Sequence, residues 1–527
     1  MSIAFATVGD LVARAATQFP ERVAVRERAG AARTYRELDD RTDRLANALL
    51  AAGLEPGDRV AAWMADRVEY VELYLAAAKA GLVVAPINAR LAPPEAAFLL
   101  SDSGARALVY SDDMAESVSA VDAVGHEDML TIAVGADHLG ADARWEHLVE
   151  RGGRGRPAPP DPDALLILGY TSGTTGRPKG AMLTHRSVLA IGRMNANSFR
   201  LPPHATVALT GSMSFVAVVP AHVLCTMYLA GTLVIMGRWS ADELLDTVER
   251  DRVTFAYVPS PLLDDVTAAF EANPSALAPL GSLLHSASKA PPEKLEALHA
   301  VIGSRLVEGW GMTENSGGLM TCTTAQDYLS AGPGDAIFGS VGRSAVEVAI
   351  KLIDSDGASL PWDGETVGEL CFSSPGLMAG YWQRPEPTAE VLQDGWFRTG
   401  DLGTIAPSGH VRIAERRTDL IVSGGANVYP SEVERCIGEL CGVREVAVVG
   451  VPHERWGQTV LAVVVRDPSQ PALTEEAVID HCRAQLAGFK KPSRVLFVDE
   501  LPRTAGLKVA RGQLRDQVLA RLKRDAA

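Results

Sequence analysis

A run of small and hydroxyl-bearing residues surrounds one lysine immediately after a short apolar segment. The string GYTSGTTGRPKG occupies residues 169–180 and follows the apolar run 164–168. Its glycines allow backbone N–H groups to face a ligand, while the hydroxyls and Lys179 add donors and a positive charge. We therefore predict a phosphate-binding loop, although a plain surface loop would explain the tripeptide Ser-Gly-Thr taken alone. The segment is not a Walker A motif, because Gly180 stands where that motif requires Ser or Thr.

Five further segments combine aromatic, acidic, basic and glycine residues. They are EGWGMTE at 308–314, WFRTGD at 396–401, ERRTD at 415–419, SGGANVYPSEVE at 423–434, and LPRT at 501–504 with Lys508 and Arg511 beyond it. In this order, and after the phosphate loop, they resemble the motifs of the acyl-adenylate-forming superfamily. That superfamily includes acyl- and aryl-CoA synthetases, 4-coumarate:CoA ligase, firefly luciferase and the adenylation domains of nonribosomal peptide synthetases. The resemblance covers nearly the whole chain, from Thr34 to Arg515.

The resemblance implies a reaction in two halves that uses ATP, Mg²⁺ and CoA. A small carboxylic acid first attacks the α-phosphate of ATP and releases pyrophosphate, and a thiol then takes the acyl group. Because the attack sets one anion against another, catalysis must come from positioning and charge neutralisation. The resemblance assigns these residues to ATP and AMP: Thr171, Ser172, Gly173, Thr174, Thr175, Gly176, Lys179, Trp310, Asp401 and Arg416.

Three residues are expected to carry the catalysis. They are Lys508, Thr313 and Glu314. Lys508 is the expected transition-state cation, and Glu314, which follows Thr313, is the expected oxygen ligand of Mg²⁺. Trp310 would offer a flat face to adenine, and Asp401 a carboxylate to the ribose hydroxyls. Plainer alternatives stand beside these roles: a solvated side chain for Lys508, a core residue for Trp310 and a turn cap for Asp401.

The pocket for the acid is expected to draw on three parts of the chain. Its residues are Ser212, Met213, Ser214, Phe215, Val216, Val219, Ser286, Lys289, Gly309, Gly311 and Gly317. Small residues beside Phe215 and Trp310 indicate a roomy, flat and largely apolar cavity, which favours an aromatic or otherwise bulky acid. Lys289 could pair with a substrate group or be a solvated loop lysine. Segment 212–219 contains no Asp to anchor an α-amino group, which disfavours an amino-acid substrate.

The chain departs from the superfamily pattern in four places. The expected pivot is Thr418 instead of Asp or Lys, and Gly506-Leu507 precedes the catalytic lysine where Thr-Gly or Ser-Gly is usual. Phe215, in the segment SMSF, is expected in the usual place of a histidine. The adenine segment reads SASKAP at 286–291 in place of Gly-Gly-Ala-Pro. The last two departures lie in segments expected beside the acid, so they bear on which acid is bound.

Apolar runs and amphipathic segments alternate along the first three hundred residues. We predict helices and strands in alternation: helices over 38–52 and 68–80, and strands over 59–64, 82–86 and 164–168. Such alternation predicts parallel sheets built from βα units. A β-rich part with strands over 348–353 and 368–372 follows, and a compact α+β unit begins near residue 431. The predicted fold class is α/β: a large N-terminal domain of βα-layered sheets plus a β-rich subdomain, with a small mobile α+β C-terminal domain.

The resemblance also implies the domain boundaries. Residues 1–415 would bind ATP and the acid, and residues 416–527 would form the mobile domain that carries the catalytic lysine, with a hinge at 416–419. Rotation about this hinge would withdraw Lys508 and bring in the loop of Gly424 and Gly425 for the CoA step. Arg416, expected near ribose or phosphate, could instead be an ordinary surface arginine.

Composition limits the partners. Lys and Arg number 50 against 65 Asp and Glu, and the resulting net charge of −15 has the wrong sign for binding nucleic acid. The six cysteines form no CxxC pair, which is typical of a reduced cytoplasm and not of a metal site. The N-terminus lacks a signal-peptide pattern, and the apolar stretch 215–236 is broken by Pro220 and His222. We therefore expect a cytoplasmic protein without a membrane partner, and predict a buried strand and helix for this stretch.

Together these observations predict an ATP-dependent acid–CoA ligase acting on a benzoate-, naphthoate- or cinnamate-like or otherwise bulky acid. Medium- and long-chain fatty acids are the alternative substrates, and a carrier protein is the alternative acceptor. A luciferase-like oxygenase and a non-catalytic nucleotide-binding homologue are more distant alternatives. The joint presence of Lys179, Glu314, Asp401, Arg416 and Lys508 argues against the non-catalytic one. The resemblance also allows a homodimer and a role in secondary metabolism.

Overall fold

The computed structural model describes residues 7–122, 129–135, 140–171, 178–286, 290, 292–416, 421–428, 430–468, 473–502, 509 and 511–525. The chain divides into two compact units. The N-terminal unit is formed mainly by residues before Arg416, and the C-terminal unit mainly by residues from Arg416 onward. The N-terminal unit has three sheets and the C-terminal unit one, and each unit has its own buried apolar core.

One sheet of the N-terminal unit has the strand order β7-β6-β5-β3-β4-β8-β9. Its strands are β3 (Arg59–Trp63), β4 (Val83–Pro86), β5 (Ala107–Ser111), β6 (Leu130–Val134), β7 (Ala143–Arg144), β8 (Leu165–Thr171) and β9 (Lys179–Thr184). Every pairing described from β7 to β8 is parallel. The helices that alternate with these strands along the chain are α1 (Gly9–Gln18), α2 (Tyr35–Ala51), α3 (Val68–Ala80), α4 (Pro93–Ser103), α5 (Ala115–Asp122) and α6 (Trp145–Arg151). Residues 90–99, which include most of α4, belong to the C-terminal unit. The predicted βα units are thereby confirmed.

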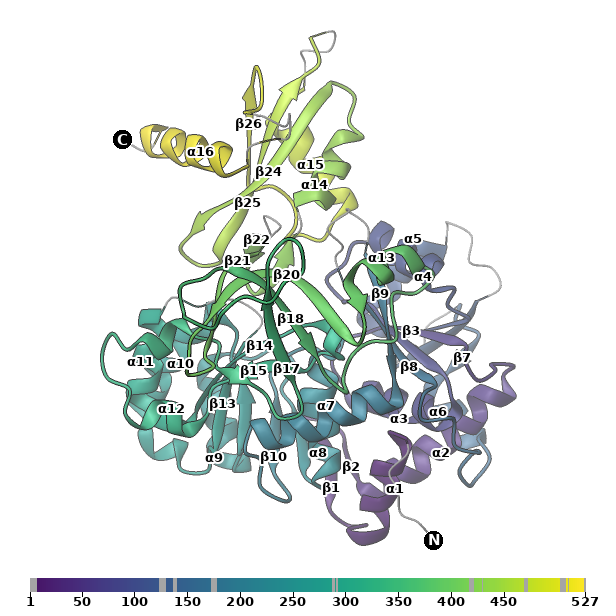
Figure 1. The fold of residues 1–527 in the computed structure, drawn as a ribbon. Coiled ribbons are helices and arrows are strands. Elements are labelled where there is room, and N and C mark those ends of the chain that lie inside the picture. Colours follow the sequence, from purple (N-terminus) through teal and green to yellow (C-terminus); the bar gives the residue numbers. More distant parts are fainter. Residues whose placement is uncertain are drawn as a thin grey trace. The chain divides into compact units, whose positions relative to one another are not determined.

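A second sheet of this unit has the order β16-β15-β14-β13-β12-β10-β11-β1-β2. Its strands are β1 (Val23–Glu27), β2 (Ala32–Thr34), β10 (Thr206–Leu209), β11 (Thr232–Ile235), β12 (Phe255–Tyr257), β13 (Ser282–His285), β14 (Leu306–Gly311), β15 (Leu319–Cys322) and β16 (Arg343–Ser344). The accompanying helices are α7 (His185–Ser198), α8 (Cys225–Tyr228), α9 (Ala241–Asp251), α10 (Leu263–Ala272), α11 (Pro292–Ile302) and α12 (Ala325–Leu329). Helices α9, α10 and α11 form a layer beside this sheet and share an apolar cluster with it (Figure 1).

The predicted β-rich part forms a third sheet in the order β17-β18-β20-β19, with β21 paired to β20. Its elements are β17 (Ala349–Ile353), β18 (Gly368–Ser373), α13 (Pro385–Val391), β19 (Leu392–Gln393), β20 (Trp396–Ile405) and β21 (Val411–Arg416). The C-terminal unit holds the sheet β23-β22-β25-β24, with β26 paired to β25. Its elements are β22 (Ile421–Ser423), β23 (Ala426–Val428), α14 (Pro430–Gly438), β24 (Val443–His453), β25 (Gly457–Arg466), α15 (Glu475–Gln485), β26 (Arg494–Val498) and α16 (Arg511–Asp525). The α/β fold class is confirmed.

Several predicted segments differ in detail. Strand β8, for example, ends at Thr171 and not at residue 168. Helix α2 begins at Tyr35 and not at residue 38, because Thr34 and Glu37 form a capping box that satisfies the first N–H groups. The apolar stretch 215–236 contains a π-helix (Val219–Leu224), then α8 and β11, so the helical part precedes the strand. None of the described helices is long and apolar enough to cross a membrane.

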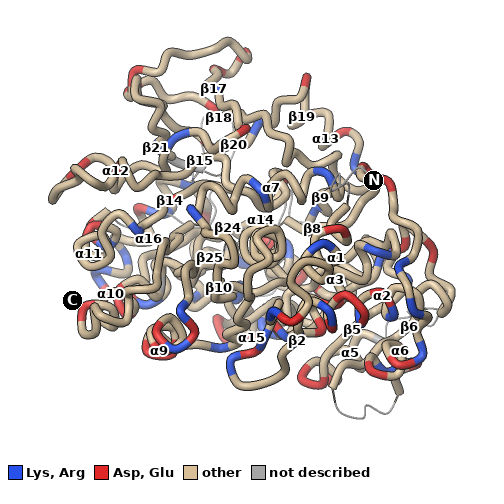
Figure 2. Tube along the Cα trace, turned by 90° about the horizontal axis from the view of Figure 1, so that it is seen from below, with Lys and Arg blue, Asp and Glu red and all other residues tan. Residues whose placement is uncertain are grey.

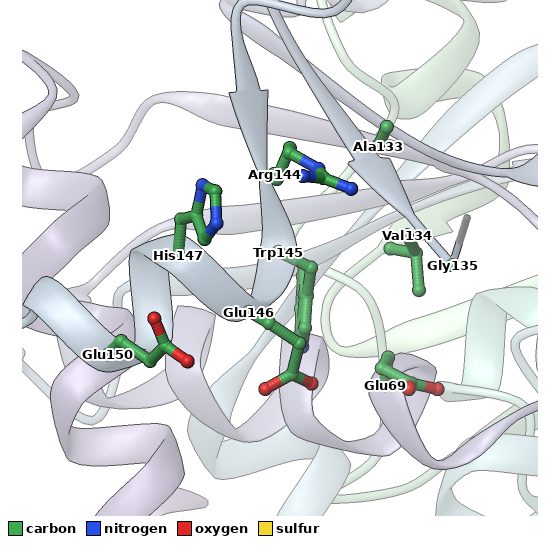
Figure 3. Close-up of a pocket in the computed structure, with 9 residues that line it drawn as sticks. All are labelled: Glu69, Ala133, Val134, Gly135, Arg144, Trp145, Glu146, His147 and Glu150. Atoms are coloured by element: carbon green, nitrogen blue, oxygen red, sulfur yellow. The ribbon is translucent and has the colours of Figure 1, made fainter. Parts of the chain in front are cut away.

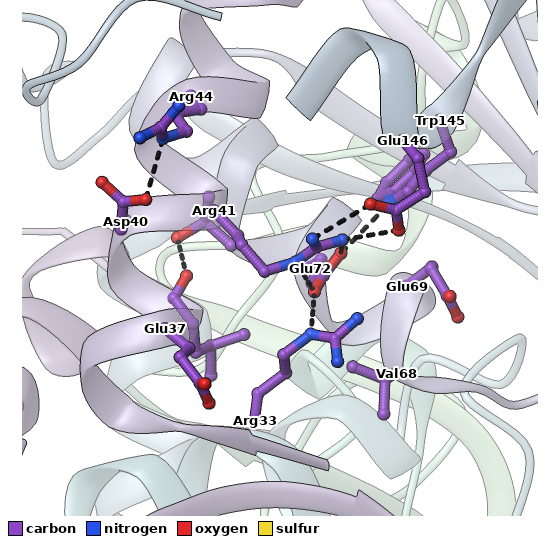
Figure 4. A network of polar contacts seen from close by, with 12 residues as sticks. Arg33, Glu37, Asp40, Arg41, Arg44, Val68, Glu69, Glu72, Trp145 and Glu146 are labelled. Carbon is purple, nitrogen blue, oxygen red and sulfur yellow. Dashed lines mark hydrogen bonds and ion pairs between the residues drawn. The ribbon is translucent and has the colours of Figure 1, made fainter. Parts of the chain in front are cut away.

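A buried carboxylate joins three helical regions of the N-terminal unit (Figure 4). Glu72 on α3 is almost fully buried and accepts hydrogen bonds from Arg33 Nε (3.1 Å), Arg41 Nε (2.6 Å) and Trp145 Nε1 (3.0 Å). Arg41 also pairs with Glu146 at the more exposed side of the cluster. Because each charge is matched, the cluster ties the residues before α2, α2 itself, α3 and α6 together.

Charged side chains on the surface helices are mixed in sign. The arginines of α2 and α6 are interspersed with Asp and Glu (Figure 2). On α2, for example, Arg44 pairs with Asp40 four residues earlier. The other two arginines of α2 are paired as well: Arg36 with Glu21, and Arg41 with Glu72 and Glu146.

Candidate active site

The predicted adenine and ribose residues meet in the structure. Trp310 lies near the end of β14 and Asp401 in the middle of β20, so they come from two different sheets. The Trp310 indole Nε1 donates a hydrogen bond to Asp401 Oδ2 at 3.1 Å, and both residues are buried. The Asp401 backbone N–H donates to Thr399 Oγ1 at 3.0 Å. One oxygen of the carboxylate is therefore held in place by the indole.

The predicted magnesium ligand follows directly in the same strand–turn segment. Glu314 lies in a 3-10 turn (Thr313–Asn315) after β14 and is 9% exposed. Tyr381 donates its hydroxyl hydrogen to Glu314 Oε1 at 2.8 Å, and the Met378 N–H donates to the Glu314 carbonyl at 2.9 Å. The segment 378–381 thus binds both the side chain and the backbone of Glu314. A carboxylate held in this way suits an oxygen ligand of a metal ion.

Several predicted residues lie outside the described part of the chain. These are Ser172, Gly173, Thr174, Thr175 and Gly176 of the phosphate loop, together with Lys289, Lys508 and the side chain of Arg416. The predicted hinge residues 417–419, with the pivot Thr418, and the pair Gly506-Leu507 also lie outside it. The two flanks of the loop are described: Thr171 ends β8, Lys179 begins β9, and the Thr171 hydroxyl donates to the Lys179 carbonyl at 3.4 Å.

The loop predicted for the CoA step is a tight turn in the C-terminal unit. Gly424 and Gly425 connect β22 to β23 with φ of 58° and 77°. The Gly424 N–H donates to the Trp456 carbonyl at 2.9 Å, and a Cβ on Gly424 would lie 2.8 Å from the Trp456 ring. Both the positive φ and the indole therefore require glycine at 424.

The segment predicted to line the acid pocket is a tight turn followed by the π-helix. Met213, Ser214, Val216 and Val219 are buried, Ser212 is half-buried, and Phe215 is 42% exposed. A Cβ on Gly169 of β8 would lie 2.5 Å from the Val216 side chain and 3.1 Å from that of Thr313. The structure therefore brings the acid segment and the Thr313–Glu314 turn to the same strand.

The glycines of the predicted pocket are explained by close packing against neighbouring segments, which the sequence interpretation missed. A Cβ on Gly309 would lie 2.7 Å from the Leu319 side chain, and one on Gly311 2.6 Å from the Gly318 carbonyl, both in or next to β15. Gly317 has φ of 73°, and its Cβ would lie 2.3 Å from the Ala217 Cα. At each of these positions the absence of a Cβ allows a neighbouring segment of the chain to pack closely.

A buried hydrogen-bonded chain under this region was not predicted. His285 and Glu308 stand opposite each other on β13 and β14, with His285 Nδ1 2.5 Å from Glu308 Oε2. Ser260 Oγ lies 2.7 Å from His285 Nε2. Burial raises the pKa of Glu308, while His285 acts in the opposite direction. Next to this chain, the Ser286 hydroxyl donates to the Gly309 carbonyl at 2.8 Å and so joins two predicted pocket residues.

A separate hollow of about 260 Å³ lies at another place in the N-terminal unit (Figure 3). Its lining comes from the end of β6, from β7 and α6, and from Glu69 of α3. None of the predicted site residues is among its lining residues.

Comparison with known proteins identifies the family. The AMP-binding enzyme family matches residues 12–382, and the AMP-binding enzyme C-terminal domain matches residues 432–508. A feruloyl-CoA synthase from Amycolatopsis is 35% identical over 96% of this chain and 98% of its own length. A long-chain-fatty-acid–CoA ligase, FadD13, from Mycobacterium tuberculosis is 34% identical over 92% of this chain and 93% of its own length.

A solved structure supports the same conclusion. The amide bond synthetase McbA from Marinactinospora thermotolerans superposes with a TM-score of 0.86 at 27% identity, covering 97% of this chain and 99% of its own. Fold, motif residues and relatives agree along nearly the whole length. The chain therefore belongs to the AMP-binding enzyme family, within the acyl-adenylate-forming superfamily that its motifs indicated, and is an adenylate-forming ligase.

Proposed function

We propose that the protein joins an aromatic or otherwise bulky carboxylic acid to CoA, with ATP and Mg²⁺, through an acyl-adenylate. The main support for this proposal is a group of three residues, Trp310, Asp401 and Glu314, which we call the corner. In it the Trp310 indole N–H fixes the Asp401 carboxylate, and a tyrosine hydroxyl fixes the Glu314 carboxylate. Two carboxylates held in this way suit a ribose with its two hydroxyls and a Mg²⁺ ion carried by phosphates.

In this proposal each predicted residue keeps its role. Asp401 binds the ribose, Trp310 flanks the adenine, and Glu314 supplies one oxygen to Mg²⁺, whose other ligands are phosphate and water. The phosphate loop from Thr171 to Lys179 holds the β- and γ-phosphates. Lys508, in the domain of residues 416–527, neutralises the charge that develops as the acid attacks, and Gly424 and Gly425 serve the CoA step. Residues 1–415 bind ATP and acid, and residues 416–419 form the hinge.

The aromatic class of acid is supported by two observations. Phe215 presents a partly exposed ring beside Val216 in the predicted acid segment. The relative with 35% identity over 96% of the chain is a feruloyl-CoA synthase. Long-chain fatty acids form the second candidate class, because FadD13 is nearly as similar.

The acceptor is the second part of the proposal. CoA is favoured by both curated relatives, whereas McbA is an amide bond synthetase and so points to an amine as the alternative. A carrier-protein thiol is a further alternative.

We also propose that the enzyme is cytoplasmic. Whether it is a homodimer would be tested by light scattering.

The test is pyrophosphate release with ATP and Mg²⁺ over a panel of benzoic, naphthoic, cinnamic, medium-chain and long-chain acids. Each acid is tested without acceptor, with CoA and with a simple amine. Aromatic acids that give pyrophosphate, and a thioester only when CoA is present, are expected. Pyrophosphate without thioester would contradict CoA as the acceptor, and silence across the panel would contradict the proposed activity.

A matched pair of variants tests the catalytic lysine. Lys508→Ala should lower acyl-adenylate formation by at least ~10²-fold, the scale of losing one preorganised charge. Lys523→Ala removes an exposed lysine on α16 and should leave the rate unchanged. Equal rates in the two variants would remove Lys508 from the mechanism.

A further inference from the structure

The turn that begins the acid segment is held mainly by side chains. The Phe215 N–H donates to the Ser212 carbonyl at 2.9 Å and closes the turn. Inside it, the Ser214 N–H donates to Ser212 Oγ at 3.3 Å, and the Ser212 and Ser214 hydroxyl oxygens are 2.9 Å apart. The turn presents Phe215 outward and passes directly into Val216, so its shape sets where both side chains stand.

One carboxylate from a different strand–helix connection binds this turn. Asp66 lies between β3 and α3, and its Oδ1 accepts hydrogen bonds from the Met213 N–H at 2.8 Å and from Ser212 Oγ at 3.3 Å. Because the single Ser212 hydrogen is given to Asp66, the Ser214 hydroxyl must donate to Ser212. The carboxylate therefore fixes the direction of the whole hydroxyl pair.

The carbonyl of the same residue is also bound by a side chain. Tyr74 on α3 donates its hydroxyl hydrogen to the Met213 carbonyl at 3.0 Å. Met213 is fully buried, so both of its backbone groups need partners, and both find them on Asp66 and Tyr74. The turn is thus anchored to the first parallel sheet and its helix α3 through these two side chains.

The carboxylate is maintained against an electrostatic cost. Burial raises the pKa of Asp66 to about 6, and the hydrogen bonds from Met213 and Ser212 only partly oppose this. Asp66 acts on Tyr70 and Tyr74 of α3, whose hydroxyl pKa values burial raises above their usual range, so both stay neutral. Arg67, the next residue in the chain, is paired with Glu69 and Asp112. Among the groups that act on Asp66 in the described residues, none is a cation.

An asparagine would accept the same two hydrogen bonds without this cost. The retained negative charge is therefore better explained by a need for strong acceptor bonds than by shape alone, since hydrogen bonds to a charged group are stronger than neutral ones. Functional groups are often kept at the expense of stability.

We propose that Asp66 is a positioning residue for the acid: its carboxylate holds the Ser212–Phe215 turn in the shape that receives the acid. The inference rests on the proposed function, because it assigns the acid to this segment. It goes beyond it by predicting that acid binding, and not ATP binding, depends on a residue outside every motif.

The test uses Asp66→Asn with Asp142→Asn as its matched control. Asp142 likewise accepts from one backbone N–H and one hydroxyl, both of Thr131 at 2.8 Å, but lies in an exposed position away from the acid segment. Pyrophosphate release gives KM for acid and for ATP, and urea unfolding gives stability. Asp66→Asn should raise KM for the acid at least ~5-fold, the difference between charged and neutral acceptors, and leave KM for ATP within about twofold.

Two further readouts separate positioning from simple structural support. At pH 8, Asp66→Asn should unfold at higher urea than the wild type, because it removes a partly desolvated charge, and this gain should vanish towards pH 4 where the native carboxyl is protonated. KM for the acid should rise in the wild type as pH falls below about 6, and stay flat in Asp66→Asn. Asp142→Asn should change none of these quantities.

The outcomes distinguish the two proposals. An active wild type whose Asp66→Asn variant keeps the wild-type KM for the acid, or changes both KM values equally, overturns the positioning role alone. A wild type that releases no pyrophosphate with any acid overturns the proposed function and this inference with it. Should Asp66→Asn unfold earlier than wild type at pH 8, the carboxylate is a structural support and the inference is again wrong.

Discussion

Replacing Trp310 by phenylalanine tests the corner on which the proposed function depends. Phenylalanine keeps the aromatic face but removes the Nε1–H that donates to Asp401 at 3.1 Å. Asp401 is 3% exposed, so water cannot readily replace the lost donor. A hydrogen bond to a charged group contributes about 1.5–3 kcal/mol.

This energy converts directly into the expected kinetic effect. At about 1.4 kcal/mol per tenfold change, the loss corresponds to a roughly 10- to 150-fold rise in KM for ATP if the freed carboxylate must be ordered again by the ribose. KM for the acid should change much less. The assay is pyrophosphate release at saturating acid with varied ATP, together with urea unfolding of the same variant.

Trp382→Phe is the control for this variant. It removes an indole N–H in the same unit that donates to the Asp102 carbonyl at 3.2 Å and not to Asp401 or Glu314. It should lower stability by about 1 kcal/mol, as for a neutral hydrogen bond, without changing KM for ATP. If Trp310→Phe behaves like this control, with KM for ATP within twofold of wild type, the bond to Asp401 is only structural and our account of the corner is wrong.

Three further predictions concern side chains and backbone of the same unit. Glu72→Ala removes the buried carboxylate that binds Arg33, Arg41 and the Trp145 indole, and should cost about 3–5 kcal/mol in urea unfolding, whereas the half-exposed Glu146→Gln should cost under about 1 kcal/mol; similar losses would contradict the burial argument. Tyr381→Phe removes the donor to Glu314 and should raise the Mg²⁺ concentration for half-maximal rate several-fold, which a magnesium titration checks; an unchanged titration would detach Tyr381 from the metal. Gly317→Ala should destabilise by more than the ~1–2 kcal/mol of positive φ alone, because the added Cβ meets the backbone of Ala217. Gly395→Ala is the control, because Gly395 has φ of 75° but no atom within 4 Å of an added Cβ, so its loss of stability measures the backbone strain alone. Equal losses of stability in the two variants would exclude the clash at Gly317.

Local patterns were sufficient to predict most elements. Helix 68–80 is found with both ends as predicted, because its apolar residues run between a β-strand and a left-handed Gly81 that ends it. The phosphate loop, Trp310, Glu314 and Asp401 could be predicted as site residues because each lies in a continuous motif. A sequence shows directly only which residues are close together along the chain.

Contacts between segments were not predictable in the same way. The pairing of His285 with Glu308 depends on the register of two parallel strands, although a titratable residue within each apolar strand was a visible sign that a partner was needed. Asp66 carried a weaker sign, as a polar residue just after a buried strand. Glycines 309, 311 and 317 were interpreted as open space because a sequence does not show which neighbouring backbone fills it.

The bond between Trp310 and Asp401 also bears on how the protein is made. The two residues are 91 positions apart, so a nascent chain that has folded β14 still lacks the carboxylate until β20 is synthesised and its sheet has formed. Under the proposed roles, tight nucleotide binding would arise only after both sheets have assembled. Since a ligand that binds only the folded form stabilises it, ATP would then favour the completed two-sheet structure over a chain in which one sheet has opened. Protection of β20 from proteolysis or hydrogen exchange by ATP would therefore measure the assembly of the N-terminal unit itself.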